Sequence, residues 1–447
     1  MIAGAKILPQ ASVVLNPGDE PPNADHARRF LLATEYPITT VDATAYQEVT
    51  GHSVADSSTA VMSLAVVDAL SMAKQDPVVG RAEFFDFRGW IAPLPSIGTS
   101  DHMAQYSGIL AGDLLRAYAI RLAYQDDPEC HLPWSDEQFA TISFIQEFSD
   151  TSKELGRDGF AVLHIHLSGG GHYLVGGDSR NLGATRIGVG ICIEPDPFDL
   201  STIALSDVVD QEDLVSKIPV SGTDAYLLVA TGTLPLVLGH NAFQRLKAAG
   251  ADRSPPETYE STPKMLYQQS EAIEAEATTI TRIAVVGNSS DGLGPCGELA
   301  RSRRTQWIHT YRSEADWTSG AWKLTHGSAA VAEFDGSRDA TAGTGRLDVY
   351  AVPDESNLLQ GIRFEVGADL PQVDGLIGHE FLRRFQMIID YPGSRLVLRC
   401  ARYRLPSGQT CDATAVETNG ESCCESTGRC LCPMSSPCCQ YPAIPKL

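Results

Sequence analysis

The segment ATEYPITTVDATAYQEV, residues 33–49, aligns without a gap with ATGTLPLVLGHNAFQRL, residues 230–246. Four positions are identical, and both segments carry alanine, an aromatic residue and glutamine in a row at the same place. An apolar run precedes each segment, at residues 30–32 and 226–229. This pattern predicts one structural unit used twice: a buried strand, a turn and a short helix.

A second pair of segments follows in the same order along the chain. Residues 108–124, GILAGDLLRAYAIRLAY, match residues 375–391, GLIGHEFLRRFQMIIDY, again without a gap. In both segments two apolar residues precede a small residue, which predicts a buried strand, and Asp113 or Glu380 then marks the start of a helix. Two pairs of segments in the same register predict two duplicated lobes.

Length and composition agree with this division. The chain has 447 residues, too many for one typical domain, and 43% of them are hydrophobic. Its 39 glycines and 26 prolines favour short strands joined by turns. We expect a mainly β fold with an N-terminal lobe at residues 1–200, a C-terminal lobe at residues 201–405 and a cysteine-rich tail at residues 406–447.

The net charge argues against two classes of partner. A formal charge of −22 would repel a nucleic-acid backbone or an anionic membrane surface. The one compact basic cluster, Arg301–Arg304, is predicted to form a solvated face. No apolar run approaches the roughly 20 residues that span a bilayer, so we expect no transmembrane segment. Residues 1–16 lack the features of a secretory signal.

Cysteine usage points to an oxidising compartment. Eight of the 11 cysteines gather near the C-terminus and are the disulfide candidates: Cys400, Cys411, Cys423, Cys424, Cys430, Cys432, Cys438 and Cys439. Such density predicts a disulfide-bonded tail in a secreted, periplasmic or cell-surface protein. A zinc site is the alternative, but the paired CxxC motifs of zinc ribbons are absent. The odd total leaves one thiol unpaired or bonded to another chain.

The matched segments resemble the lobes of bilobal aspartic peptidases, both pepsin-like and retropepsin-like and of the bacterial type. The resemblance is clearest in the strand and Thr-Gly turn of residues 227–232 and in the apolar-apolar-Gly segment before a helix at residues 375–385. It implies a bilobal pepsin-like acid-protease β-barrel fold. It also implies that each apolar segment packs beneath a turn; the residues concerned are Gly108, Ile109, Leu110, Gly375, Leu376, Ile377 and Gly378.

The chain departs from this family at the residues that carry the chemistry. Each lobe of an aspartic peptidase supplies an Asp-Thr/Ser-Gly turn, and the two aspartates share one proton so that one acts as base and the other as acid. Here the two aspartate positions hold Ala33 and Ala230, and Glu35 stands at the glycine position of the first turn. Alanine can neither accept nor donate a proton, so we expect no catalytic residue.

The other turn residues remain candidates for a binding cleft between the lobes: Thr34, Glu35, Thr231 and Gly232. The resemblance implies that the two threonine hydroxyls tie the turns together. Glu35 and Asp224 are expected to be solvated carboxylates, and an asymmetric catalytic pair made of these two is the alternative.

Histidines offer one further possibility. His164, His166 and His172 could converge on a metal ion if two neighbouring strands carried them on one face. The HExxH motif of zinc proteases is absent. We favour histidines on a half-exposed strand face, and we predict neither a metal nor another cofactor.

The sequence therefore predicts a secreted or surface-exposed pseudopeptidase whose interlobe cleft binds a peptide or protein ligand. Two alternatives stay open: an active aspartic endopeptidase with an atypical pair of carboxylates, and a structural protein of the cell envelope. The sequence does not predict an oligomeric state.

Overall fold

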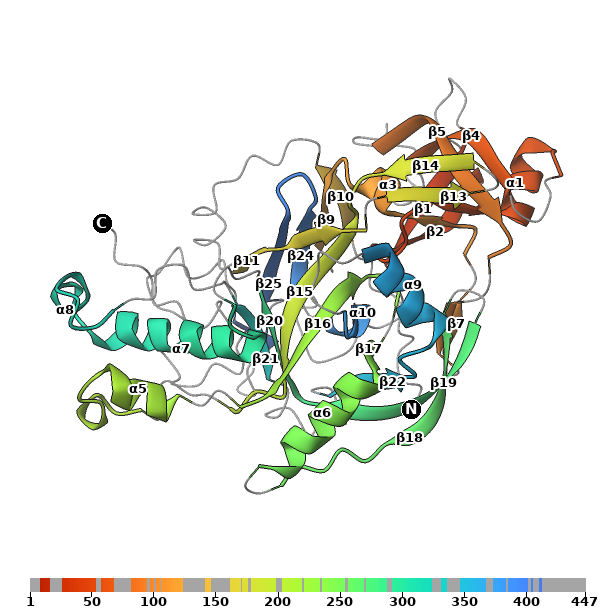
Figure 1. Ribbon diagram of the computed structural model, residues 1–447. Coiled ribbons are helices and arrows are strands. Elements are labelled where there is room, and N and C mark those ends of the chain that lie inside the picture. The colour runs from red at the N-terminus through yellow and green to blue at the C-terminus, as the bar shows by residue number, and fades with distance from the viewer. Residues whose placement is uncertain are drawn as a thin grey trace.

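The computed structural model of the chain is built mainly from β-strands, which form several sheets (Figure 1). The residues that it describes are 9–16, 26–53, 58–67, 82–94, 97–99, 102–104, 106–123, 141–145, 161–169, 171–175, 178–197, 203–218, 221–233, 235–253, 256–268, 271–287, 292–323, 331–335, 346–366, 373–382, 385–400, 403–404 and 410–411. Among these residues no helix is both long and apolar enough to cross a membrane.

The pairings of six N-terminal strands close into a ring. The ring runs in the order β1 (Gln10–Leu15), β2 (Arg28–Leu32), β8 (Gly108–Leu110), β3 (Thr40–Asp42), β5 (Ala82–Ala92) and β4 (Ser58–Val67), and β4 pairs with β1. Val13, Phe30, Leu64 and Ile91 come from four of these strands and are fully buried in one core. Apolar side chains from around the ring thus meet in its interior.

A 12-stranded sheet forms the largest part of the molecule. Its strand order is β21 (Val331–Asp335), β20 (Arg282–Val286), β15 (Arg186–Ile193), β16 (Thr223–Ala230), β23 (Gly375–Gly378), β17 (Leu236–Gly239), β22 (Leu347–Val352), β19 (Glu271–Ile280), β18 (Thr262–Gln268), β6 (Ile97–Thr99) and β7 (His102–Ala104), with β12 (His166–Ser168) paired to β15. β15, β16 and β23 are buried along most of their length, as strands covered on both faces are.

A third sheet combines strands from both halves of the chain. Its order is β10 (Thr141–Ile145), β9 (Ala119–Ala123), β24 (Phe385–Asp390), β25 (Arg395–Cys400) and β11 (Ala161–His164). β9 and β24 run antiparallel, with Arg121 opposite Ile388 (Figure 1). These two residues hold the same position in the aligned segments, so an approximate twofold axis passes between them.

Two short hairpins complete the strands: β13 (Gly171–Val175) with β14 (Asp178–Leu182), and β26 (Tyr403–Arg404) with β27 (Thr410–Cys411). β15 ends before residue 200 and pairs with β16 and β20, which follow it. The large sheet therefore takes strands from both sides of the boundary expected at residue 200. The division into lobes and a tail stays a prediction.

Two helices follow the turns of the first aligned pair, α1 (Ala43–Thr50) and α6 (His240–Ala251). Asp42 caps α1 by accepting a hydrogen bond from the backbone N–H of Thr44. The corresponding residue before α6 is Gly239, and Asp354 from another part of the chain accepts from Asn241 instead. A Cβ atom on Gly239 would collide with Asp354, which explains the glycine. One cap is thus local and the other is supplied from a distance.

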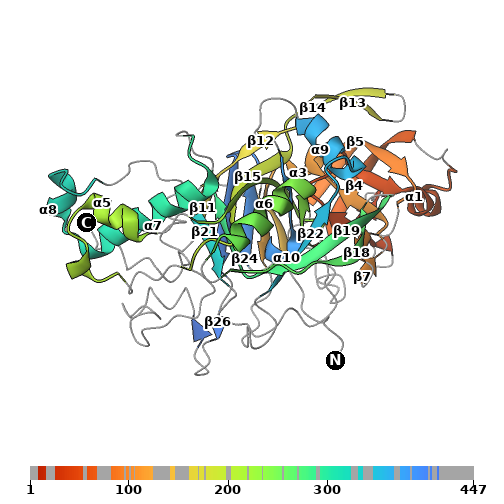
Figure 2. The ribbon, with the colours of Figure 1, turned by 60° about the horizontal axis from the view of Figure 1, so that its bottom comes forward.

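The remaining helices are α3 (Gly112–Leu115), α5 (Gln211–Lys217), α7 (Pro295–Tyr311), α8 (Glu314–Thr318), α9 (Asn357–Val366) and α10 (His379–Leu382), with one 3-10 turn, η3 (Leu205–Asp207). α5, α7 and α8 lie together at the end of the molecule away from the ring of strands (Figures 1 and 2). α5 and α7 share a small core that includes Trp307 and also Trp322, which follows α8. Arg312 lies 3.9 Å from the centre of the Trp322 ring.

A disulfide between Cys192 and Cys296 joins β15 to the first turn of α7. The two cysteines lie 104 residues apart, and neither was among the residues predicted to form disulfides. Cys400 and Cys411 lie in β25 and β27, and their side chains are outside the described residues. The other six cysteines predicted to form disulfides lie entirely outside them. Cys192 and Cys296 are both buried, and the covalent bond between them fixes the start of α7 to the large sheet.

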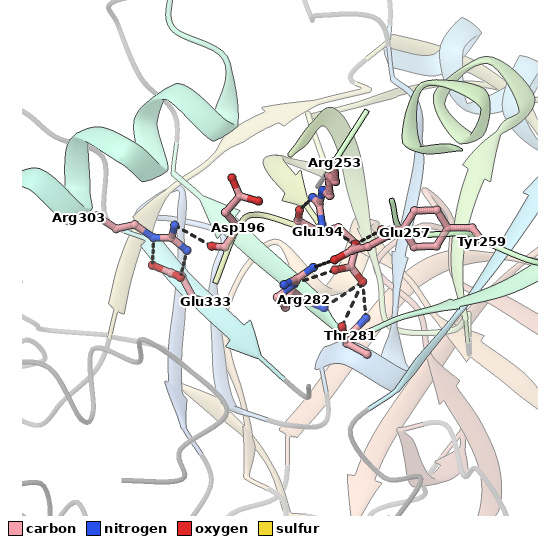
Figure 3. Close-up of polar contacts among 9 residues, drawn as sticks. All are labelled: Glu194, Asp196, Arg253, Glu257, Tyr259, Thr281, Arg282, Arg303 and Glu333. Atoms are coloured by element: carbon pink, nitrogen blue, oxygen red, sulfur yellow. Dashed lines mark hydrogen bonds and ion pairs between the residues drawn. The ribbon is translucent and has the colours of Figure 1, made fainter. Parts of the chain in front are cut away.

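Buried ion pairs support the same region (Figure 3). Arg303 of α7 binds Glu333 of β21 with N–O distances of 2.8 and 3.3 Å, and Arg301 pairs with Glu298. Both arginines are buried, so the prediction of a solvated basic face at residues 301–304 was wrong for these two. Arg303 thus meets a carboxylate of the sheet, whereas Arg301 meets one a turn earlier in the same helix, so each buried guanidinium has an opposite charge beside it.

A second polar network ties β15 to β20 and to the chain after α6 (Figure 3). Glu194 accepts hydrogen bonds from the backbone of Thr281 and from the Nε of Arg282. Arg282 also binds Glu257, which accepts a hydrogen bond from Tyr259. Every charged group in this network has an opposite charge beside it, as burial requires.

Candidate functional site at the junction of two turns

The site is formed by two turns, residues 33–35 and 230–232, which follow the strands β2 and β16. β2 lies parallel to β8 with Phe30 opposite Gly108, and β16 lies parallel to β23 with Leu227 opposite Gly375. Gly108 and Gly375 open the second pair of aligned segments, and Phe30 and Leu227 each lie three residues before the first pair. The two turns therefore begin at equivalent positions of two equivalent pairs of parallel strands.

Close packing explains the glycine that opens each apolar-apolar segment. A Cβ atom on Gly375 would collide with the carbonyl oxygen of Val237. A Cβ atom on Gly108 would collide with the ring of Phe30. The segments that follow, Ile109–Leu110 and Leu376–Gly378, are buried directly against the strands that lead into the turns. Only glycine lets the strands come this close.

Reciprocal hydrogen bonds join the two turns. The hydroxyl of Thr34 donates to the carbonyl oxygen of Val229 at 2.7 Å, and the hydroxyl of Thr231 donates to that of Leu32 at 2.7 Å. Each hydroxyl also accepts from the backbone N–H of the other threonine, at 3.1 and 3.3 Å. Both threonines are fully buried. The pattern maps onto itself when the turns are exchanged, so it has the same approximate twofold symmetry as the β9–β24 pair.

Alanine occupies the first position of each turn. Ala33 and Ala230 are both fully buried. The Cβ atom of Ala33 lies 2.7 Å from the place where a Cβ atom of Gly232 would be, so the turns touch. The side chains of Leu31, Ile109 and other apolar residues pack around Ala33. Neither position holds a group that can transfer a proton.

Glu35 brings a carboxylate across the junction. Its Oε2 accepts from the backbone N–H of Gly232 at 3.1 Å, and its Oε1 accepts from the hydroxyl of Thr233 at 3.2 Å. Only 6% of the residue is exposed, so the expectation of a solvated carboxylate was wrong. Burial raises the pKa of Glu35 to about 7, although the Gly232 hydrogen bond and the charge of Arg186 act in the opposite direction.

Two tyrosines belong to the same electrostatic environment. Burial raises the pKa of Tyr36 and of Tyr391, and the charge of Glu35 raises both further while Arg186 lowers them. Among the described residues neither phenol oxygen has a hydrogen-bond partner. Arg186 is itself buried at the start of β15. The junction thus holds one acid and one guanidinium in largely apolar surroundings.

The structure does not bring Asp224 to Glu35. Asp224 lies near the start of β16 and accepts from the backbone N–H of Cys296 at 2.7 Å, at the start of α7. Six residues of strand separate it from Ala230, which is about 20 Å at the usual rise per residue. A catalytic pair made of Glu35 and Asp224 is therefore excluded by their placement.

The three histidines do not form a common site in the described part of the chain. His164 lies on β11 and His166 on β12, and both are exposed. His172 lies in β13, and its side chain is outside the described residues. Within the described ranges no three His, Cys, Asp or Glu side chains are grouped as metal ligands.

Sequence reasoning missed several residues of the junction. Thr233 follows the second turn directly, so its hydroxyl could have been predicted as a hydrogen-bond donor at the junction. Thr39 donates through its N–H and its hydroxyl to Asp113, which fixes α3 beneath the first turn. Arg186 is distant in sequence, and no local pattern marks it.

Comparisons with known proteins give a structural likeness alone. No family model matches the chain, and no curated protein matches it. Among solved structures, the chain is similar to the crystal structure of an aspartic proteinase from Irpex lacteus, with 10% identity and a TM-score of 0.34. The match covers 90% of this chain and 97% of that one.

Proposed function

We propose that the chain is a catalytically inactive homologue of the aspartic peptidases, which binds an extended peptide between its lobes and does not cleave it. One observation carries the proposal. The reciprocal bonds of Thr34 and Thr231 join two turns whose acid positions hold Ala33 and Ala230. The junction has the form that such a peptidase needs and lacks both of its acids.

The chemistry supports inactivity. Peptide hydrolysis by this mechanism requires one carboxylate to take a proton from water while a second donates one to the leaving group. Glu35 is the carboxylate found in the two turns, and its oxygens already accept from Gly232 and Thr233. A single buried acid without a partner cannot perform both proton transfers.

Peptide binding is supported by what the junction retains. Four hydrogen bonds between fully buried threonines and backbone groups hold the turns together. An extended peptide can bind through its backbone to strands exposed on either side of such a junction, which needs no acid. The buried disulfide between Cys192 and Cys296 supports a secreted or surface location, because disulfides persist in oxidising compartments.

Binding and cleavage can be tested on the full-length protein. The protein is incubated at pH 3 to 7 with a library of fluorescent extended peptides, with and without pepstatin. We expect saturable changes in anisotropy and no new peptide termini by mass spectrometry. Cleavage that pepstatin blocks would overturn the claim of inactivity. Failure of every peptide to bind at high micromolar concentration would overturn the claim of a peptide ligand.

A further inference from the structure

We propose that Glu35 supplies a single carboxylate, placed between the two turns, that takes the place of both missing carboxylates and clasps the turns together. The inference rests on the proposed function, since it assumes that residues 33 and 230 are former acid positions. The carboxylate of Glu35 would explain why the two turns stay joined without the two missing carboxylates.

The hydrogen-bond donors around Glu35 are those that the missing acids would use. An aspartate commonly accepts a hydrogen bond from the backbone N–H two residues further along the chain. An acid at position 33 would accept from the N–H of Glu35, and one at position 230 from the N–H of Gly232. The carboxylate of Glu35 accepts from both of these groups. One side chain therefore satisfies a donor from each turn.

The position of the carboxylate agrees with the symmetry of the junction. Residues 35 and 232 hold the same place in the aligned segments, as do Thr34 and Thr231, whose hydrogen bonds are reciprocal. A group that accepts from both equivalent N–H groups lies close to the approximate twofold axis. Thr233 adds a third donor from the second turn.

The carboxylate of Glu35 and the methyl group of Ala33 fill the volume beside Gly232 in the second turn. Oε1 of Glu35 lies 2.6 Å from the place where a Cβ atom of Gly232 would be, and the Cβ atom of Ala33 lies 2.7 Å from it. An aspartate at position 230 would accept from the N–H of Gly232, which the carboxylate of Glu35 already occupies. Glu35 and an acid at position 230 therefore exclude each other.

The titratable groups around this carboxylate come from three parts of the chain. Arg186 approaches from β15, Tyr36 is the next residue in the turn, and Tyr391 follows β24. Arg186 is the one cation that acts on Glu35 among the described residues. A second carboxylate in the same volume would repel the first, and Arg186 could offset only one of them.

A double-mutant cycle tests the exclusion. Thermal and urea unfolding are measured at pH 7.5 for the wild type, Ala230→Asp, Glu35→Gly and the double variant. We expect Ala230→Asp to destabilise the wild type but to restore part of the stability lost in Glu35→Gly. The coupling should change the unfolding equilibrium constant on the order of tenfold or more, as for residues of one hydrogen-bond network. Equal effects of Ala230→Asp in both backgrounds would overturn the proposal.

A milder variant covers the case in which the aspartate variants do not fold. Thr233→Val removes one donor to Glu35, so its cost should largely vanish in the Glu35→Gly background. Thr40→Val is the matched control, because the hydroxyl of Thr40 donates locally to Ile38 and its cost should be equal in both backgrounds. Equal costs of Thr233→Val in both backgrounds would refute the clasp. Both cycles measure unfolding and use neither a peptide nor a cleavage assay. A result that refutes the role of Glu35 can therefore be told apart from one that refutes the proposed function.

Discussion

Replacing either junction threonine by valine should destabilise the protein, and the two variants should do so equally. Thr34→Val removes the hydrogen bond to the carbonyl oxygen of Val229 at 2.7 Å and the acceptor of the Thr231 N–H at 3.3 Å. Thr231→Val removes the bond to Leu32 at 2.7 Å and the acceptor of the Thr34 N–H at 3.1 Å. The two losses are the same in kind because the turns are related by the approximate twofold axis.

The expected cost follows from the groups left behind. Each variant leaves one backbone carbonyl and one backbone N–H in a fully buried place without these bonds. A buried polar group that loses its partner costs about 1–3 kcal/mol, so each variant, which leaves two such groups, should lose about 2–6 kcal/mol of unfolding free energy. Valine has nearly the shape of threonine, so packing contributes little to this difference.

Urea unfolding followed by tryptophan fluorescence and circular dichroism measures the loss. Thr40→Val is the control, since Thr40 is also buried but its hydroxyl bonds only to Ile38, two residues away. Thr34→Ser and Thr231→Ser keep the hydroxyl and should recover most of the stability. If Thr34→Val and Thr231→Val cost no more than the control, or differ from each other severalfold, the symmetric junction is refuted.

Three further predictions concern charge and covalent links. Because the folded pKa of Glu35 is about 7 and the reference value is 4.5, the wild type should lose about 3 kcal/mol of unfolding free energy as pH rises from 4.5 to 7, and Glu35→Gln should lack this loss in urea titrations at the two pH values. Replacing Cys192 and Cys296 by alanine should cost about 4–5 kcal/mol, because the disulfide closes a loop of 104 residues; an unchanged melting temperature would contradict this. Arg282→Met should cost about 3–5 kcal/mol in denaturant unfolding by leaving the charge of Glu194 buried without its partner, and a neutral effect would show that the network is dispensable.

The sequence predicted much of the backbone around the junction. The chain is mainly β, as expected, and short helices begin near Asp113 and Glu380. Gly108 and Gly375, which the second alignment paired, also hold the same register against the strands that lead into the turns. These features are predictable because close strand packing demands glycine and apolar residues at fixed spacing, which leaves a pattern in the sequence.

Side-chain contacts across the junction could not be predicted. The alignment treated Glu35 as a turn residue in water, whereas it is buried against Gly232, 197 residues away. Arg301 and Arg303 were expected on a solvated face and instead bind buried carboxylates. The Cys192–Cys296 disulfide was missed for the same reason. Such contacts depend on how segments distant in sequence pack against each other, which the local spacing of residues does not indicate.

The most direct test of the central claim is a cleavage assay on the wild type beside the variant Ala33→Asp/Glu35→Gly/Ala230→Asp. This variant restores both acids and vacates the volume that Glu35 fills. Digestion of unfolded protein at pH 3 to 6 should give no pepstatin-sensitive products with the wild type and detectable ones with the variant. Pepstatin-sensitive cleavage by the wild type that persists through purification would contradict the account of an inactive peptidase junction, and its loss in Glu35→Gln would make Glu35 the catalytic carboxylate.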